Sequence, residues 1–98
     1  MTDHDRSILV TGASSGIGGA IAARLGKEGY SVIVHYGSNR TGAAATLEAI
    51  EAAGGRGRTI SFDVADTAAT EAAIERDIEE HGAYYGVVCN AGVTRDAA

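Results

Sequence analysis

A glycine-rich stretch, T-G-A-S-S-G-I-G at positions 11–18, holds the residues with the clearest chemical potential. Glycine lacks a Cβ atom, so Gly12 can take a positive φ, Gly16 lets the backbone approach a phosphate, and Gly18 allows close packing against a strand. The helix that follows would direct free N–H groups and the positive end of its dipole at an anion, and the two serine hydroxyls can donate to the same oxygens. The stretch therefore predicts a diphosphate site, with a turn that binds nothing as the alternative.

The residues expected after the second strand, H-Y-G-S-N-R at positions 35–40, contain no carboxylate. A protein that binds NAD(H) places a carboxylate there, about 20 residues after the glycine turn, on the ribose 2′-hydroxyl. A carboxylate would repel a 2′-phosphate, whereas Arg40 could pair with one and Ser38 or Asn39 could add hydrogen bonds. The segment therefore favours NADP(H), the alternative for Arg40 being a solvated loop charge.

Three short motifs together resemble the short-chain dehydrogenase/reductase family. They are T-G-x-x-x-G-x-G at 11–18, D-V at 63–64 and N-A-G at 90–92. The resemblance implies a Rossmann-type fold and a nicotinamide cofactor bound where the three motifs meet.

Individual roles follow from the same resemblance. Asp63 would accept a hydrogen bond from the adenine amino group, although from the residues alone it could equally be a turn or helix-flanking aspartate. Asn90 would tie the fourth strand to the glycine turn through Thr11, and Gly92 would let the chain pass close to the ribose. The candidate cofactor-binding residues are Gly12, Ser14, Ser15, Gly16, Ile17, Gly18, Ser38, Asn39, Arg40, Asp63, Val64, Asn90, Ala91 and Gly92.

Within that family, N-A-G-x-T-R-D at 90–96 is similar to the 3-oxoacyl-acyl-carrier-protein reductases. This likeness implies reduction of a β-ketoacyl thioester with NADPH in fatty acid or polyketide-type synthesis. It also implies a substrate linked to acyl carrier protein and a full-length homo-oligomer. Two alternatives stay open: a non-catalytic NADP(H)-binding module, and a family member that reduces a different carbonyl substrate.

No catalytic residue is assigned in these 98 residues. The family's hydride transfer uses a serine and a tyrosine with a lysine four residues on, so that the ammonium lowers the tyrosine pKa. The single lysine, Lys27, follows Ala23 at that spacing, not a tyrosine. In the family these residues lie beyond the N-A-G motif, so we expect this chain, as the amino-terminal part of a reductase, to bind cofactor without turnover.

Composition narrows the possible partners. The net charge is −5 and the eight basic residues are scattered, which argues against nucleic acid. No apolar run approaches the roughly 20 residues that span a bilayer, and the acidic start at 1–5 is unlike a secretory signal, so a cytoplasmic protein without membrane contact is expected. The lone cysteine, Cys89, excludes an internal disulfide and is interpreted as a small buried hydrophobe. We identify no metal site.

Apolar runs, helical periods and glycine stops alternate along the chain and predict the element order β-α-β-α-β-α-β. A flexible tail is expected at 1–6 and a partial NADP(H)-binding Rossmann domain at 7–98. The expected fold is the amino-terminal half of a doubly wound parallel sheet with strand order 3-2-1-4. Strands are predicted at 7–11, 30–36, 58–64 and 84–90. A first helix is predicted at 16–28, a second from a Thr41 cap to about 53, and a third from an Asp66 or Thr67 cap to about 81.

This arrangement has two consequences. All the candidate residues fall at the carboxyl ends of the strands, where open α/β sheets bind ligands. The fourth strand would lie at an edge although V-V-C at 87–89 is apolar and lacks a protecting charge, so either another segment covers it or the chain associates.

In the first helix, a stripe of Ile17, Ile21 and Leu25 is expected to be buried.

Overall fold

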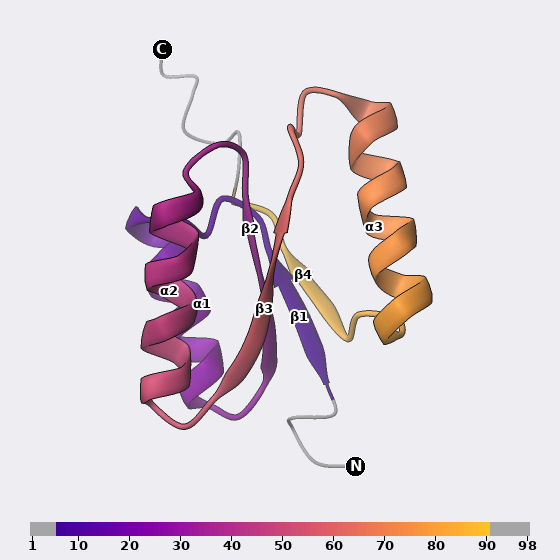
Figure 1. Ribbon diagram of the computed structural model, residues 1–98. Helices are drawn as coiled ribbons and strands as arrows, with labels where there is room; N and C mark the ends of the chain where they lie inside the picture. Colours follow the sequence, from indigo (N-terminus) through magenta and orange to yellow (C-terminus); the bar gives the residue numbers. More distant parts are fainter. Residues whose placement is uncertain (1–5, 91–98) are drawn as a thin grey trace.

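Strands and helices alternate in the computed structural model, which describes residues 6–90 (Figure 1). The strands are parallel and stand in the order β3-β2-β1-β4, which confirms the predicted Rossmann-type α/β topology. In the described part of the chain the elements are β1 (Ser7–Val10), α1 (Gly16–Lys27), β2 (Ser31–Tyr36), α2 (Arg40–Ala52), β3 (Arg56–Ser61), α3 (Thr67–His81) and β4 (Gly86–Val88).

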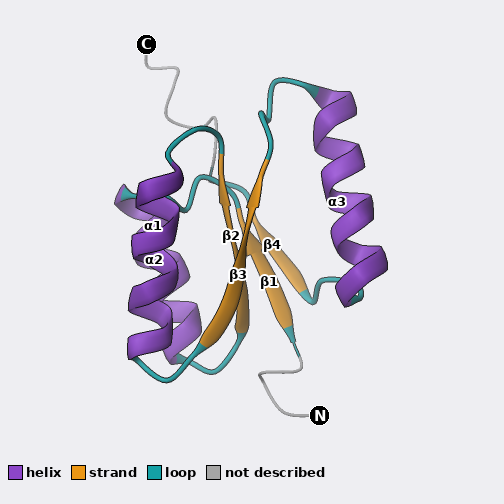
Figure 2. Ribbon diagram, viewed as in Figure 1, coloured by secondary structure: helices purple, strands orange, loops and turns teal. Residues whose placement is uncertain are grey.

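The two faces of the sheet are covered by different helices. Helices α1 and α2 lie on one face and α3 on the other (Figure 2). Side chains alternate between the faces along each strand. Val10 beside Val34 therefore packs under α1 and α2, while the next pair, Leu9 beside Ile33, faces α3. All four side chains are buried, so the central strands form the core of the fold.

The buried face of α1 differs from the predicted stripe. Ile17 is 72% exposed, and the other two members of the stripe are only partly buried. A Cβ on Gly26 would lie 2.7 Å from Cγ2 of Ile50 in α2, which shows how closely the two helices approach. Small residues permit this approach, and the buried positions fall one residue later than expected, at Gly18, Ala22 and Gly26.

Several element boundaries differ from the sequence prediction. Helix α2 begins at Arg40, and its N-cap is Asn39 in place of Thr41 because the Asn39 Oδ1 accepts a hydrogen bond from the Gly42 N–H at 2.9 Å. Strand β3 begins earlier than expected and pairs only to Ser61, and β4 is three residues long. Of the two predicted caps of α3, Asp66 is the N-cap and Thr67 the first helical residue, since the Asp66 carboxylate accepts from the Ala69 N–H at 3.0 Å.

Helix α3 is fastened to the sheet by a polar cluster. Its buried residue is Asp77, whereas Ile78 of the predicted apolar stripe is 37% exposed. The Asp77 carboxylate accepts two hydrogen bonds from Arg58 in β3 and one from the Tyr84 hydroxyl. Burial opposes its ionisation, but these hydrogen bonds prevail and lower the pKa of Asp77 below 3.8. Burial and the same carboxylate raise the pKa of Tyr84.

The outer edge of the sheet exposes apolar side chains. Val87 in β4 is 51% exposed and Tyr85 just before it is 61% exposed. Cys89 is also exposed, so its interpretation as a buried hydrophobe is wrong. The reason is its place directly after the edge strand, which pairs only with β1 in the described part of the chain. Within residues 6–90 no helix has the length and apolar character to cross a membrane.

Candidate cofactor-binding site

The turn between β1 and α1 needs glycine for two different reasons. Gly12 and Gly16 have φ values of 65° and 61°, a backbone conformation that residues with a Cβ atom rarely adopt. A Cβ on Gly18 would lie 2.1 Å from the Gly12 carbonyl oxygen and 2.6 Å from Nδ2 of Asn90. In contrast, among residues 6–90 no atom lies within 4 Å of the position a Cβ would take on Gly16. The turn is thus tightly packed on its protein side and open beside Gly16.

Strand β4 and the residues after it hold the start of this turn. The Thr11 N–H donates to the Val88 carbonyl at 2.9 Å. The Asn90 N–H donates to Oγ1 of Thr11 at 2.8 Å, and the Asn90 amide nitrogen donates to the Gly12 carbonyl at 3.2 Å. The predicted tie between Asn90 and Thr11 is therefore present, and it extends to the backbone of the turn.

Two residues that the sequence reasoning missed hold the turn from the other side. His35, at the end of β2, accepts the Gly12 N–H on Nδ1 at 2.9 Å and the Ala13 N–H on its carbonyl at 2.8 Å. Thr46 in α2 donates its hydroxyl to the Ala13 carbonyl at 2.9 Å. Both are polar residues at buried positions, His35 in an apolar strand and Thr46 between the buried Ala43 and Ile50. A polar side chain in such a place needs a partner, and that signal could have found them.

The first turn of α1 retains N–H groups for a ligand. Its N-cap, Ser15, has an extended backbone with φ −169° and gives the helix no side-chain cap. The first N–H groups of a helix have no acceptor within the helix, and they carry the positive end of its dipole. Ser15, Gly16 and Ile17 are all exposed, and Ser14 is half-buried. This end of the helix can therefore hold an anionic group such as a diphosphate.

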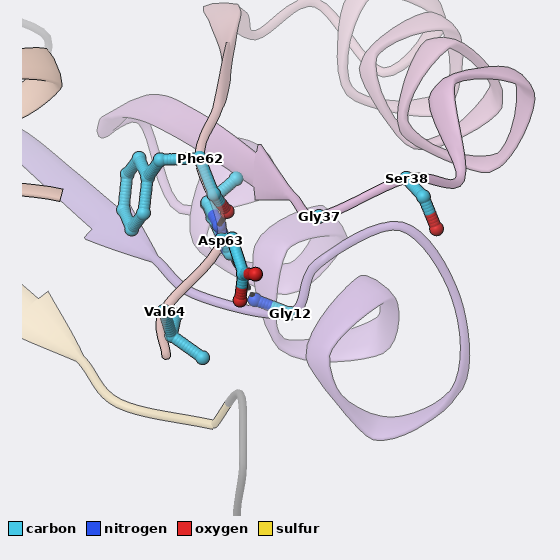
Figure 3. A pocket seen from close by; sticks show the side chains of 7 residues that line it. Gly12, Gly37, Ser38, Phe62, Asp63 and Val64 are labelled. Atoms are coloured by element: carbon cyan, nitrogen blue, oxygen red, sulfur yellow. Dashed lines mark hydrogen bonds between the residues drawn. The ribbon is translucent and has the colours of Figure 1, made fainter. Parts of the chain in front are cut away.

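Beside the turn lies an open cavity of about 370 Å³ (Figure 3). Its lining comes from the glycine turn, the end of β2 and the segment after β3. It thus brings together three groups of predicted residues, the glycine turn at 11–18, the end of β2 at 35–40 and the D-V pair at 63–64. From the fourth group, N-A-G at 90–92, Asn90 is linked to the cavity by its hydrogen bond to the Gly12 carbonyl. The lining residues are Gly12, His35, Gly37, Ser38, Phe62, Asp63 and Val64.

Other predicted residues lie around the cavity in different ways. Asn39 uses its side-chain oxygen to cap α2. Arg40 is exposed at the first position of α2, close in sequence to the cavity lining, and its N–H donates to the Ser38 carbonyl at 3.0 Å. Asp63 accepts the Ala65 N–H on Oδ1 at 2.9 Å, as a turn aspartate does.

Some predictions concern residues outside the range 6–90 that the structure describes. Ala91 and Gly92 lie outside the described residues, as does most of the tail predicted at 1–6. Val64, by contrast, is 45% exposed at the cavity. Among residues 6–90 no group of three histidine, cysteine, aspartate or glutamate side chains is placed to hold a metal ion.

A parallel sheet of order 3-2-1-4 with a glycine turn after its first strand defines the Rossmann-type class of α/β proteins. The family model described as short chain dehydrogenase matches residues 6–98, and the chain belongs to this family.

Relatives carry more specific names. The chain is 46% identical over 92 residues to a 3-oxoacyl-[acyl-carrier-protein] reductase FabG of Aggregatibacter actinomycetemcomitans, covering 94% of this chain and 38% of the relative. It is 43% identical over 91 residues to the protein of the same name in Staphylococcus aureus, covering 93% and 37%. It is also 42% identical over 90 residues to an uncharacterized oxidoreductase of Methylorubrum extorquens, covering 92% and 36%.

A solved structure shares the fold. It is described as the promiscuous reductase LugOII, which catalyses keto-reduction at C1 during lugdunomycin biosynthesis. The TM-score is 0.65 and the sequence identity 38%, over 76% of this chain and 32% of that chain. The chain therefore spans less than two fifths of the length of the relatives named here.

Proposed function

We propose that this chain is the NADP(H)-binding portion of a 3-oxoacyl-acyl-carrier-protein reductase. The observation that carries the proposal is the convergence of the open glycine turn, the end of β2 and the segment after β3 on one cavity. The reductase assignment draws on the relatives of that name and on the N-A-G-x-T-R-D pattern at 90–96. As in those relatives' names, the substrate would be an oxoacyl group on acyl carrier protein.

The described residues fit a dinucleotide. The space beside Gly16 is open, and the first-turn N–H groups of α1 would hold the diphosphate. Asp63 lines the cavity with Val64, where the adenine would lie, and its second carboxylate oxygen could accept the amino group while Oδ1 holds the turn. When bound, the cofactor would supply the hydride for carbonyl reduction.

The preference for NADP(H) depends on the end of β2. No carboxylate stands between His35 and Arg40 to repel a 2′-phosphate. Arg40 is exposed and able to turn its guanidinium toward such a group, with the Ser38 hydroxyl at the cavity as a second donor.

Calorimetric titration of the chain with NADPH and with NADH tests this proposal. We expect binding of NADPH in preference to NADH, and a loss of about tenfold or more in NADPH affinity in Arg40→Ala, since a charged hydrogen bond contributes about 1.5–3 kcal/mol. The matched control is Arg56→Ala, which removes the same charge from an exposed site at the start of β3. Equal affinity for the two cofactors, or equal losses in the two variants, would contradict the NADP(H) assignment.

The 98 residues contain no tyrosine followed four residues later by lysine, so we expect the chain alone to reduce no β-ketoacyl thioester. Consumption of NADPH with such a substrate by the purified chain would overturn this part of the proposal. The relation to a promiscuous keto-reductase favours one alternative, a different carbonyl substrate. A panel of ketones and thioesters, assayed with the longest form of the protein that the gene encodes, distinguishes a β-ketoacyl thioester substrate from a different carbonyl substrate.

A further inference from the structure

His35 is held between two backbone groups of opposite hydrogen-bonding character. Its Nδ1 lies 2.9 Å from the Gly12 nitrogen, and its Nε2 lies 2.8 Å from the Phe62 carbonyl oxygen. An N–H can only donate and a carbonyl can only accept. Nδ1 must therefore be the acceptor and Nε2 must carry the proton. The two contacts together select one neutral tautomer of the imidazole.

Protonation would remove one of these two bonds. In the imidazolium both ring nitrogens are donors, so Nδ1–H would face the Gly12 N–H at 2.9 Å with no acceptor between them. The bond to Phe62 would survive, because Nε2 donates in both states. A proton added to His35 thus acts specifically on Gly12, where the glycine turn begins.

The surroundings of His35 oppose its charged form. The residue is 2% exposed, and the Phe62 ring lies against it with 4.0 Å between ring centroids. Burial lowers the pKa of His35 below 6.5, although the hydrogen bond to the Phe62 carbonyl acts in the opposite direction.

Few charges face the imidazole. The turn at 11–18 and strand β1 contribute no charged side chain to its surroundings. Among the residues lining the cavity, Asp63 is the other ionisable one, and it is exposed, so solvent screens its charge. In the segment 36–40 that follows His35, the ionisable residues are Tyr36, the last residue of β2, and Arg40, the first residue of α2.

We infer that His35 is a pH-sensitive positioning residue that holds the glycine turn in its binding geometry when neutral and releases Gly12 when protonated. The inference rests on the proposed function for its effect on NADPH, but the link between His35 and Gly12 stands on the geometry alone. Binding should be strongest where His35 is neutral, and it should weaken as the pH falls through the lowered pKa of His35. We expect a loss of about tenfold, the equivalent of one net hydrogen bond.

Asparagine provides the discriminating variant. In His35→Asn the side-chain oxygen can accept the Gly12 N–H and the amide nitrogen can donate to Phe62, but neither group titrates. His35→Leu fills similar space without hydrogen bonds, and His35→Gln is a second amide in case asparagine does not reach. Circular dichroism at each pH confirms that every variant compared is folded.

The first measurement is NADPH affinity from pH 7.5 down to the lowest pH at which circular dichroism shows that the variants compared are folded. The 2′-phosphate of the ligand titrates near pH 6 and weakens binding in all variants alike, so the comparison between proteins removes its effect. We expect wild type to lose about tenfold more affinity than His35→Asn over this range. His35→Leu should bind weakly throughout. Parallel pH profiles for wild type and a folded amide variant would overturn the inference.

The second measurement needs no cofactor. In nuclear magnetic resonance titrations of the chain, the Gly12 amide should shift with the same midpoint as the His35 ring nitrogens, and it should stay unchanged in His35→Asn. If NADPH fails to bind at any pH while Gly12 follows His35, the proposed function fails and the link stands. If Gly12 does not follow His35, the inference is wrong whatever the cofactor does.

Discussion

Arg58 donates two hydrogen bonds to the Asp77 carboxylate, at 2.9 Å from Nε to Oδ1 and 2.7 Å from Nη2 to Oδ2, and so joins β3 to α3. Tyr84 donates to the same carboxylate at 2.7 Å. The side chains are 25% exposed for Arg58 and 9% for Asp77, which distinguishes this ion pair from an ordinary surface pair.

Replacing Asp77 with asparagine should lower the free energy of unfolding by about 2–3 kcal/mol, because charged hydrogen bonds are lost while Arg58 stays partly buried. Chemical denaturation measures the change. The control is Glu28→Gln, which breaks the exposed pair between Arg24 and Glu28 and should change stability by no more than about 0.5 kcal/mol. Similar losses in both variants would contradict the special role of the buried pair.

The same carboxylate gives a pH dependence with a definite sign. The pKa of Asp77 is lower in the folded chain than its ordinary 3.8, so its stabilisation is complete above pH 3.8 and is lost as the pH falls through the lowered folded pKa. The stability difference between wild type and Asp77→Asn should therefore shrink in acid. Denaturation curves at pH 6 and near pH 3 check this, and a difference that grows in acid would contradict it.

Gly18 is a glycine of the turn whose position leaves no room for a side chain. In Gly18→Ala the new Cβ would collide with the Gly12 carbonyl and the Asn90 amide, so we expect a loss of about 3 kcal/mol or more. Gly86→Ala is the control, because no atom lies within 4 Å of its Cβ position. Thermal unfolding compares the two, and equal melting temperatures would show that the turn yields without cost.

Thr46 tests whether α2 supports the turn. Its hydroxyl is 2.9 Å from the Ala13 carbonyl at a position only 9% exposed. Thr46→Val leaves that carbonyl without this donor and should cost about 1–3 kcal/mol, whereas Thr46→Ser keeps the hydroxyl and should cost less. Denaturation of both variants gives the order, and a valine variant as stable as wild type would contradict a supporting role for the hydroxyl.

Strand β4 predicts self-association of the chain. Within residues 6–90 its outer edge pairs with no other strand, and β4 carries the half-exposed Val87 next to the exposed Tyr85. A charge on an edge strand discourages pairing with a second copy, so Val87→Lys should reduce association measured by sedimentation velocity. Ile17→Lys, at an exposed site on α1, is the control for the added charge alone. Unchanged association in Val87→Lys would place the contact elsewhere.

The sequence was sufficient for the order of elements because periodicity and glycine stops are local signals. Strand β2, for example, begins one residue after its predicted start, and α3 begins after one of its two predicted caps and ends at the predicted His81. The ends of strands were harder to predict. Strand β3 ends at Ser61, which pairs with Tyr36 at the end of β2, so its end depends on pairing and not on the residues of β3 themselves.

The candidate site was predictable where it is built from backbone motifs. Gly12, Gly18 and the tie from Asn90 to Thr11 follow the family pattern. His35 and Thr46 were missed because their roles arise from contacts between separate elements. Ile17 was assigned to a buried stripe because periodicity alone does not reveal that small residues, which let α1 approach α2 closely, form the buried face of this helix.

The bonds that shape the glycine turn join residues 22, 23, 33 and 77 to 79 positions apart in the chain. Such contacts form only when the elements that carry them come together, because closing the intervening chain costs entropy. The turn therefore cannot exist as a preformed local loop, and it acquires its shape only when β2, α2 and β4 are in place. A ligand that binds there stabilises the whole described fold, by about 2.7 kcal/mol at a hundred times its Kd, and not the loop alone.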